Sequence, residues 1–364
     1  MNVRVAAIEA KSGPFVFRQT EMDEPRSDEV LVRVVACGIC HTDAHVRNQG
    51  YQTPLPIVLG HEGAGVVEKV GADVERVKPG DRVAMSFPSC GRCDHCLGGH
   101  PAYCVHNLRL SFGGARLDGS NALHDGLHGH FFAQSSFATY SLATERNVVK
   151  VPDDVPLELM GPLGCGFQTG AGAVLNVLAV PVSASIVILG TGAVGLAAIM
   201  AARVVGADPI IAVDITDERL ALAQELGATH GINGKTEDVK SRVHEITRGG
   251  ADYVIELTGQ PKMLAMAVEA TAQLGMTALI GASAAGAQAP IDMTTLLNGR
   301  SVRGVIQGDA VPQLFVPKLI GLYKAGQFPF DRLVRFYEFD DIEQAFNDSK
   351  QGLTVKPVLR IGKV

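Results

Sequence analysis

The sequence has no run of lysine and arginine and no apolar N-terminal leader, and each absence excludes a class of protein. Its 32 basic and 38 acidic side chains leave a net charge of −6. Because no cationic surface suited to following phosphates is expected, nucleic acid is excluded as a partner. Arg4, Glu9 and Lys11 interrupt the first fifteen residues, where a secretion signal would be apolar. We therefore expect a cytoplasmic protein.

Charge is also missing from residues 159–202, which contain no Asp, Glu, Lys, Arg or His. A stretch of this length could cross a membrane. However, Pro162, Pro181 and several glycines interrupt it, and its most apolar part has the pattern strand, glycine turn, helix. These features predict the buried core of a globular domain and no membrane partner.

The alternation of apolar segments predicts two domains, as the length of 364 residues also favours. Short valine-rich runs in the first 150 residues are typical of a mainly antiparallel β domain; they cover residues 30–36, 65–70 and 82–85. From residue 171 strands and helices alternate, which predicts a parallel sheet. We expect strands at residues 185–189, 210–214, 253–257, 277–280 and 301–305, and helices at 196–205 and from Thr216 to Gly227. The segment after Gln313 is expected to return to the first domain.

Seven cysteines in a chain without a secretion signal favour metal binding or catalysis over disulfides. Four of them are closely spaced in a glycine-rich segment: Cys90, Cys93, Cys96 and Cys104. Four thiolates satisfy a closed tetrahedral zinc site, which needs four soft ligands and no open position. An iron–sulfur cluster and a pair of reactive thiols are the alternatives, although the usual iron–sulfur spacing has a shorter last gap. A nucleic-acid zinc finger is disfavoured by the acidic surroundings and the missing recognition helix.

A glycine fingerprint follows the expected strand at residues 186–189. Gly190, Gly192 and Gly195 would permit a tight turn, close approach of a pyrophosphate and close packing of a helix on the strand. Asp214 ends the next expected strand, where a carboxylate can accept hydrogen bonds from the adenosine ribose of NAD and repel a 2′-phosphate. A helix-packing glycine motif without a ligand is the alternative.

A third set of metal ligands is dispersed along the chain. Cys40, His61 and Cys165 could supply two thiolates and one imidazole, leaving a fourth position open for substrate, as in a catalytic zinc site. Their spacing alone cannot bring them together, so a buried structural cysteine remains the alternative for each cysteine.

These residues resemble the zinc-containing alcohol dehydrogenases of the medium-chain dehydrogenase/reductase superfamily. The segments CGICHTD, LGHEGAGVVEKVG, CGRCDHC, HFFAQSSFATYSL, GPLGCGFQTGAG and GTGAVGL are similar in order and spacing, most of all to bacterial aryl (benzyl) alcohol dehydrogenases. The resemblance implies an α/β protein with a GroES-like β-rich catalytic domain at residues 1–166, a Rossmann NAD-binding domain at 167–306, and a return to the catalytic domain at 307–364. It also implies a homodimer or homotetramer joined through the cofactor-binding domains.

The resemblance also implies roles for individual residues, with two zinc ions per subunit and NAD as cofactors. It assigns the catalytic zinc to Cys40, His61 and Cys165, and the structural zinc to Cys90, Cys93, Cys96 and Cys104. Glu62 would approach the catalytic metal, Asp43 would hold His61, and Thr42 and His45 would relay a proton. In cofactor binding, the implied residues are His41, where an arginine that binds phosphate often stands, Thr169 and Val194 behind the nicotinamide, and Lys356 at the pyrophosphate. Arg219 is the one base expected near Asp214.

The expected reaction is the oxidation of a primary alcohol, preferably aryl or allylic, to an aldehyde, with hydride transfer to NAD in a cleft between the domains. Four aromatic side chains are expected near the cleft: Phe87, Phe131, Phe132 and Phe137. Alternatives are a quinone or enal reductase of the superfamily, a dehydrogenase for aliphatic alcohols or a formaldehyde adduct, and a non-catalytic NAD-binding protein. Cys37 is expected in a strand core. His124, His128 and His130 are expected in a mobile, solvated loop, with a third metal site as the alternative.

Overall fold

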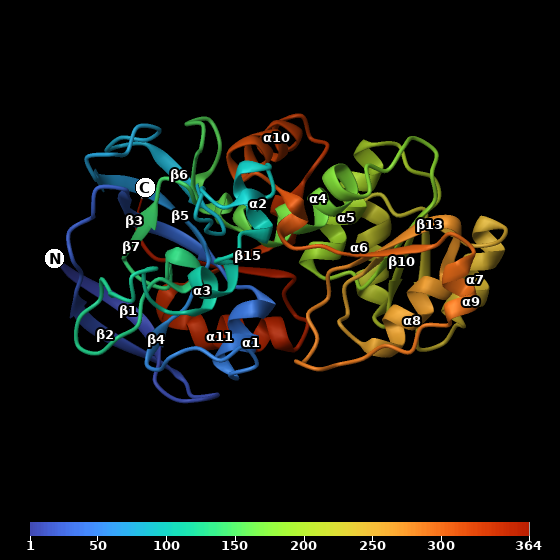
Figure 1. Cartoon of the computed structure of the whole chain (residues 1–364), viewed down its shortest axis with the longest axis horizontal. Coiled ribbons are helices and arrows are strands. Elements are labelled where there is room, and N and C mark those ends of the chain that lie inside the picture. The colour runs from blue at the N-terminus through green and yellow to red at the C-terminus, as the bar shows by residue number, and fades with distance from the viewer. Residues whose placement is uncertain (364) are drawn as a thin grey trace. The chain divides into compact units, whose positions relative to one another are not determined.

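In the computed structural model, which describes residues 1–363, the valine-rich segments near the N-terminus form two β-sheets (Figure 1). The smaller sheet has the order β2-β1-β4, with β1 at Asn2–Ile8, β2 at Phe15–Glu21 and β4 at Ile57–Val58. The larger sheet has the order β15-β16-β3-β5-β6-β8, and β7 pairs with β3. Its strands are β3 (Glu29–Gly38), β5 (Glu62–Val70), β6 (Arg82–Met85), β7 (Tyr140–Thr144), β8 (Val148–Lys150), β15 (Val334–Glu338) and β16 (Lys356–Arg360).

Four helices accompany these sheets: α1 (His41–Arg47), α2 (Asp94–Leu97), α3 (Asn107–Phe112) and α11 (Ile342–Lys350). Short 3₁₀ turns lie at Pro101–Tyr103, Phe131–Ala133, Leu157–Leu159, Gly161–Gly164 and Phe339–Asp341. Sheet pairing is antiparallel except between β15 and β16. The prediction of a mainly antiparallel β domain is therefore confirmed.

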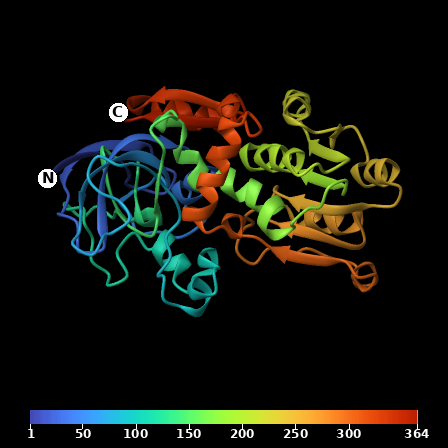
Figure 2. The same cartoon turned by 90° about the horizontal axis from the view of Figure 1, so that it is seen from above.

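A six-stranded parallel sheet with the order β11-β10-β9-β12-β13-β14 forms the centre of a second unit (Figure 2). Its strands are β9 (Ile186–Leu189), β10 (Ile210–Asp214), β11 (His230–Asn233), β12 (Ala251–Glu256), β13 (Thr271–Leu279) and β14 (Ser301–Gly304). Its helices are α4 (Gly166–Gly172), continued by a π-helical turn at Ala173–Val177, and α5 (Ala193–Val204), α6 (Asp217–Leu226), α7 (Val239–Thr247), α8 (Pro261–Ala270) and α9 (Met293–Leu297). Numbered from β9, this is the 3-2-1-4-5-6 order of a doubly wound dinucleotide-binding domain, as predicted.

The two units divide the chain unevenly at its C-terminal end. The first comprises Met1–Gly166, Val311–Leu319 and Asp331–Val364, and the second comprises Phe167–Ala310 and Ile320–Phe330. Helix α10 (Pro312–Lys324) therefore begins in the first unit and ends in the second. The prediction assigned all of residues 307–364 to the first domain. Residues 307–310 and 320–330 instead fall in the second unit, where buried Phe330 packs against Phe167 with ring centroids 5.2 Å apart.

Each unit has its own apolar core. In the first, strands β3, β5 and β6 contribute valines that are almost fully buried, such as Val32, Val67 and Val83. In the second, Val187, Leu189 and Ile211 lie among helices α7 and α8 and the sheet. The central strands β9 and β10 are covered on both faces of the sheet, so they are continuous apolar runs. Among residues 1–363, no helix is long and apolar enough to cross a membrane.

Candidate functional site

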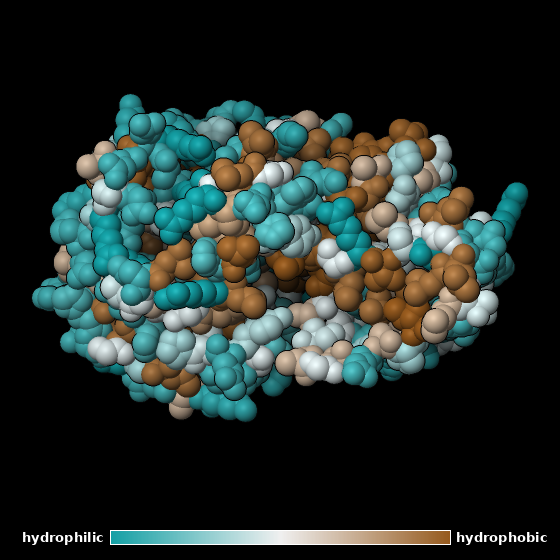
Figure 3. Space-filling view, viewed as in Figure 1, coloured by the Kyte–Doolittle hydropathy of each residue, from teal (hydrophilic) through white to brown (hydrophobic). Residues whose placement is uncertain are grey.

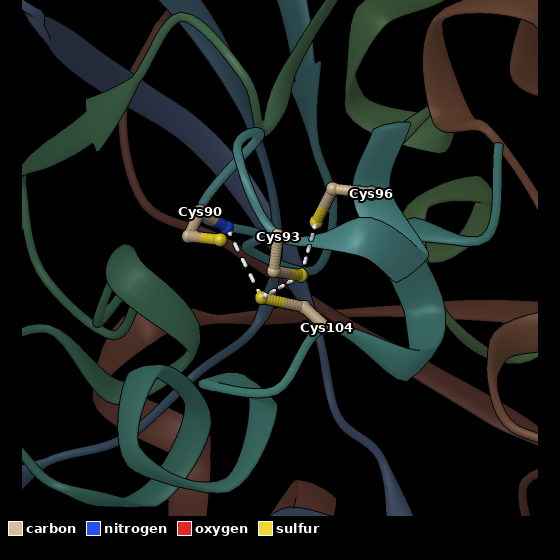
Figure 4. Close-up of side chains that lie close together, drawn as sticks. All are labelled: Cys90, Cys93, Cys96 and Cys104. Atoms are coloured by element: carbon tan, nitrogen blue, oxygen red, sulfur yellow. Dashed lines mark hydrogen bonds between the residues drawn. The ribbon is translucent and has the colours of Figure 1, made fainter. Parts of the chain in front are cut away.

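Four cysteine side chains converge in the segment that follows β6 (Figure 4). The sulfur atoms of Cys90, Cys93, Cys96 and Cys104 all lie within 4.8 Å of one another. Cys93 Sγ is 3.5 Å from Cys96 Sγ and 4.0 Å from Cys104 Sγ, which is too long for a disulfide. The set thus fits a closed tetrahedral zinc site.

Backbone amides in the same segment donate hydrogen bonds to the cysteine sulfurs. The N–H groups of Cys90 and His106 donate to Cys104 Sγ at 3.3 and 3.4 Å. Hydrogen bonding from the backbone of Val105 lowers the pKa of Cys93 to about 6. Because zinc binds the thiolate, a lowered pKa reduces the proton competition that the metal meets.

Strand pairing assembles the second group of metal ligands in the first unit. Gly38, the last residue of β3, pairs with Glu62 of β5 and with Val358 of β16. Cys40 and His61 therefore leave adjacent strands at the same end of the sheet. Ligand atoms of Cys40, His61, Glu62 and Cys165 lie within 4.8 Å of one another, and Cys165 Sγ is 3.3 Å from His61 Nε2. Two thiolates and an imidazole suit zinc, and Glu62 adds a carboxylate at the edge of the set.

The buried carboxylate of Asp43 orients this ligand set. Its Oδ1 lies 3.0 Å from His61 Nδ1 and accepts the Gly60 N–H at 3.1 Å, while Oδ2 accepts the Cys40 N–H at 2.9 Å. With Nδ1 donating to Asp43, His61 leaves Nε2 as the free ligand atom. A hydrogen bond with Cys165 holds the pKa of the Cys40 thiol well below its usual range.

A buried ion pair completes the wall of the ligand set. Lys356 Nζ donates to the two oxygens of Glu62 at 2.8 and 2.9 Å and to the Ile39 carbonyl at 3.1 Å. Burial raises the pKa of Glu62, and Lys356 opposes this effect. The resemblance assigns Lys356 to a pyrophosphate, whereas here its ammonium group binds Glu62. The pyrophosphate role stays a prediction.

Helix α1 carries the residues expected to relay a proton. Thr42 Oγ1 is 3.7 Å from Cys40 Sγ, and half-buried His45 lies one turn further along α1. The His45 ring packs edge-on against Tyr51 with centroids 4.8 Å apart, and a Cβ atom added at Gly50 would lie 2.3 Å from His45 Nε2. His41, expected near the cofactor phosphate, is exposed.

Aromatic rings connect the His61 side of the site to His45. Phe132 stacks on His61 with centroids 4.5 Å apart, and Phe131 contacts it edge-on at 5.5 Å. Phe112 lies between Phe132, at 5.4 Å, and Tyr51, at 4.8 Å.

The other two phenylalanines expected near the cleft are also buried. Phe137 packs against Phe15 and Phe346, and Phe87 is fully buried. Sequence reasoning missed Tyr51 and Phe112, although Tyr51 follows the CHTDAH segment closely enough to have been considered. Proximity in the sequence to a ligand motif was the available signal.

The segment with three histidines is packed, in contrast to the expected solvated loop. His130 is 7% exposed, and the His128 N–H donates to the Pro56 carbonyl at 2.9 Å, beside β4. Only His124 is on the surface, where Nε2 lies 2.8 Å from Asp23. The three histidines do not form a metal ligand set in residues 1–363. The expectation failed because the apolar residues between them, Leu127 and Phe131, enter the core.

The glycine fingerprint forms the turn between β9 and α5 in the second unit. Gly190 has a φ of +101°, and a Cβ at Gly195 would lie 2.0 Å from the Gly190 oxygen. Gly192 is the N-cap of α5, and no atom lies within 4 Å of the position of a Cβ there. Such a turn leaves backbone N–H groups and open space at the start of a helix, as dinucleotide binding requires.

The residues expected to contact the nicotinamide ring and the adenosine ribose also lie in the second unit. A Cβ at Gly170 would lie 2.0 Å from the Val194 oxygen, so the Thr169 segment and Val194 are adjacent. Asp214 ends β10, and Arg219 follows in α6. Burial lowers the pKa of Arg219, and the nearby Asp214 carboxylate opposes this effect.

Comparisons with known proteins agree with this arrangement of fold and ligands. Residues 26–153 match the alcohol dehydrogenase GroES-like domain, and residues 193–323 match the zinc-binding dehydrogenase family. Geraniol dehydrogenase from Castellaniella defragrans is 44% identical over 365 residues, covering 99% of this chain and 98% of that protein. Two solved structures each have a TM-score of 0.98 and full coverage of both chains. They are an alcohol dehydrogenase zinc-binding domain protein from Burkholderia ambifaria, 53% identical, and benzyl alcohol dehydrogenase from Acinetobacter calcoaceticus, 49% identical.

A GroES-like β unit, a doubly wound unit and two sets of zinc-type ligands define a two-domain dehydrogenase. The chain belongs to the zinc-containing alcohol dehydrogenases of the medium-chain dehydrogenase/reductase superfamily.

Proposed function

We propose that this alcohol dehydrogenase oxidises aryl and allylic primary alcohols to aldehydes, with NAD as the hydride acceptor. The proposal rests on the aromatic side chains beside His61. Phe131 and Phe132 contact the His61 ring, and Phe112 and Tyr51 extend this aromatic cluster. A planar, unsaturated substrate gains contact area against such rings, at roughly 25 cal/mol per Å² of apolar surface removed from water. Ethanol offers little apolar surface. The names of the geraniol and benzyl alcohol dehydrogenases support the same substrate class.

Two zinc ions per subunit are part of the proposal. Cys90, Cys93, Cys96 and Cys104 hold the structural ion, and Cys40, His61 and Cys165 hold the catalytic ion. A zinc ion at the catalytic ligands supplies the Lewis acidity that lowers the pKa of the alcohol. Asp43 keeps His61 Nε2 directed at the ion, while Lys356 neutralises Glu62 beside it.

Proton transfer uses helix α1. Thr42 would take the hydroxyl proton of the alcohol as its own hydroxyl proton passes to the cofactor ribose, and His45 would pass a proton from the ribose to solvent. The packing of His45 against Tyr51 and Gly50 supports this role, because a ring held in one orientation is prepared for proton transfer.

NAD binds at the turn between β9 and α5. Gly190, Gly192 and Gly195 admit the pyrophosphate, and Asp214 accepts hydrogen bonds from the adenosine ribose. A 2′-phosphate would bring a second negative charge beside Asp214, so kcat/KM for NAD exceeds that for NADP. Thr169 and Val194 support the nicotinamide ring, and the exposed His41 is available to the phosphates.

A second copy of the chain is proposed to pair along β14 in a homodimer. All four residues of this edge strand are exposed. Large apolar side chains gather over β13 and α9 (Figure 3), and those most exposed on these elements and β14 are Leu274, Met293, Leu297 and Val302. An exposed, apolar sheet edge favours strand pairing with another chain. A tetramer would need a further contact.

The substrate class is tested by measuring kcat/KM with NAD for ethanol, cyclohexanol, benzyl alcohol and geraniol. Benzyl alcohol and geraniol should exceed ethanol at least tenfold, about 1.4 kcal/mol of transition-state preference. Phe132→Leu should reduce the ratio of benzyl alcohol to ethanol, whereas Phe17→Leu, at a residue whose ring packs against Phe339, should leave the ratio unchanged. A tenfold lead for ethanol or cyclohexanol would refute the aryl and allylic assignment without affecting the dehydrogenase assignment.

A further inference from the structure

The Asp214 carboxylate is bound by the middle residue of the glycine turn. Its Oδ2 accepts the Thr191 N–H at 2.8 Å and the Thr191 hydroxyl at 2.7 Å, and its Oδ1 accepts the Ile215 N–H at 2.7 Å. Thr191 is fully buried, and Asp214 is half-buried at the end of β10. Because the two residues are 23 positions apart in the sequence, this is a tertiary contact between two neighbouring strand ends.

The hydrogen bonds to Asp214 use most of the acceptor sites of its carboxylate and leave one for a ligand. An ionised carboxylate offers about four acceptor sites, two on each oxygen. Thr191 occupies two sites on Oδ2, and Ile215 occupies one on Oδ1. The remaining site lies on Oδ1. The carboxylate is therefore held in one orientation before any ligand arrives.

The tight turn itself does not require threonine at this position. The positive φ belongs to Gly190, and the close approach to the Gly190 oxygen belongs to Gly195. Valine has nearly the shape of threonine but cannot donate a hydrogen bond. The hydroxyl thus serves Asp214.

We propose that Thr191 is a positioning residue that determines cofactor specificity. By holding Oδ2, it presents Oδ1 to the ribose diol of an adenine nucleotide in a fixed orientation. The inference rests on the proposed role of Asp214 in NAD binding. Preorganisation of an acceptor reduces the conformational freedom that is lost on binding, so Thr191 strengthens the binding of a free diol. NADP does not benefit, because its 2′-hydroxyl is esterified.

The test is a double-mutant cycle that measures binding of AMP to the zinc-loaded protein by calorimetry, without alcohol or hydride transfer. The variants are Thr191→Val, Asp214→Ala and the double variant, with Thr191→Ser as the matched control that keeps the hydroxyl. Thr191→Val should weaken AMP binding about fivefold. The variant loses the hydrogen bond from the Thr191 hydroxyl to the charged Asp214 carboxylate, and this loss affects AMP only through the orientation of Asp214. Thr191→Ser should bind within twofold of the wild type. In the Asp214→Ala background, Thr191→Val should have no further effect.

A ligand without the diol gives an independent control. Binding of 2′,3′-dideoxy-AMP should be the same in wild type and Thr191→Val. In turnover, Thr191→Val should raise KM for NAD about fivefold with kcat retained, and should leave KM for NADP unchanged. If Thr191→Val does not fold, Thr191→Ala replaces it in every arm.

Two outcomes would overturn the inference. One is wild-type AMP affinity in Thr191→Val, and the other is an equal loss with and without Asp214, which would mean that Thr191 acts through the turn alone. If Asp214→Ala itself leaves AMP binding unchanged, the proposed ribose role of Asp214 fails as well. This third result thereby separates failure of the proposed function from failure of the inference about Thr191.

Discussion

Single residues in this protein are held by partners that leave one functional atom free. Asp43 binds His61 Nδ1 and two backbone amides, so Nε2 is the atom left for a metal. Similarly, the Tyr51 ring and the bare backbone of Gly50 confine His45. Function at this scale therefore depends on side chains that touch no substrate.

Replacing His45 by Gln should slow alcohol oxidation by about a hundredfold, and most at low pH. A positioned imidazole takes up the proton of the alcohol where hydroxide is scarce, and an amide cannot. The measurement is the pH dependence of kcat with benzyl alcohol, together with zinc content. His230→Gln, at an exposed histidine of β11, is the control and should match the wild type. A pH–rate profile of His45→Gln parallel to that of the wild type would remove His45 from the relay.

The buried side chain of His130 should make the folded protein less stable at acidic pH. Burial, assisted by Arg116, lowers its pKa from 6.5 to about 4, while Glu29 opposes this effect. Above pH 6.5 the residue is neutral in both the folded and the unfolded chain, so it costs no stability. As the pH falls from 6.5 towards 4, the unfolded chain binds the proton first, and stability falls by up to about 3 kcal/mol.

The variant His130→Asn should lose less stability over that range, since it does not titrate and asparagine tolerates the left-handed backbone, with φ +60°, at this position. The measurement is the free energy of unfolding in urea at pH 7 and pH 5 for both proteins. Zinc ligands titrate in both, so the difference between the two slopes isolates His130. Equal slopes would contradict the prediction.

At the scale of elements, strand ends bring functional groups together. Gly38 pairs with both β5 and β16 and so places Cys40, His61 and Lys356 at one end of a sheet. The four-cysteine segment, in contrast, has little regular secondary structure of its own. Helix α2 has four residues, and the 3₁₀ turn that follows it has three. Its order therefore depends on what the sulfurs bind.

Cys93→Ser should reduce zinc from two ions to one per subunit and lower the thermal midpoint, because a structural zinc site contributes folding free energy. Metal analysis after dialysis without chelator, followed by calorimetric melting, measures both effects. Cys37→Ser is the matched control: this cysteine of β3 is buried in an apolar cluster, its thiol donates to the Gly38 carbonyl at 3.4 Å, and its loss should leave two zinc ions. Two ions in Cys93→Ser, or fewer than two in the wild type, would refute the two-site proposal.

At the scale of the whole molecule, the two units have separate chemistry: zinc-type ligands in the first and the nucleotide turn in the second. The second unit also carries the open sheet edge at β14. Its exposed leucines and methionine are costly for a chain that stays monomeric.

Val302→Pro should convert the dimer to a monomer, since proline cannot donate the backbone hydrogen bond that strand pairing uses. Sedimentation velocity over a range of protein concentrations measures the state. Leu314→Glu, at an exposed leucine of α10 in the first unit, is the control for loss of surface apolarity and should remain dimeric. A wild-type protein that sediments as a monomer at all concentrations would refute the pairing along β14.

The sequence by itself determined the features that depend on short spacing. The four cysteines from Cys90 to Cys104, the glycine turn and the strand that ends at Asp214 all lie where they were predicted, because each group is contained in one short segment of the chain. Strand β11 was not foreseen, since its sequence HGIN is short and polar and only pairing with β10 makes it a strand.

Only the tertiary structure decided which distant residues meet. Cys165 contacts His61 across 104 positions, and Lys356 contacts Glu62 across 294. The partner of Lys356 and the aromatic neighbours of His61 depend on the register of β3 against β5 and β16. A register is selected by the burial of whole sheet faces, which is a sum over many residues, so no local pattern in the sequence encodes these contacts.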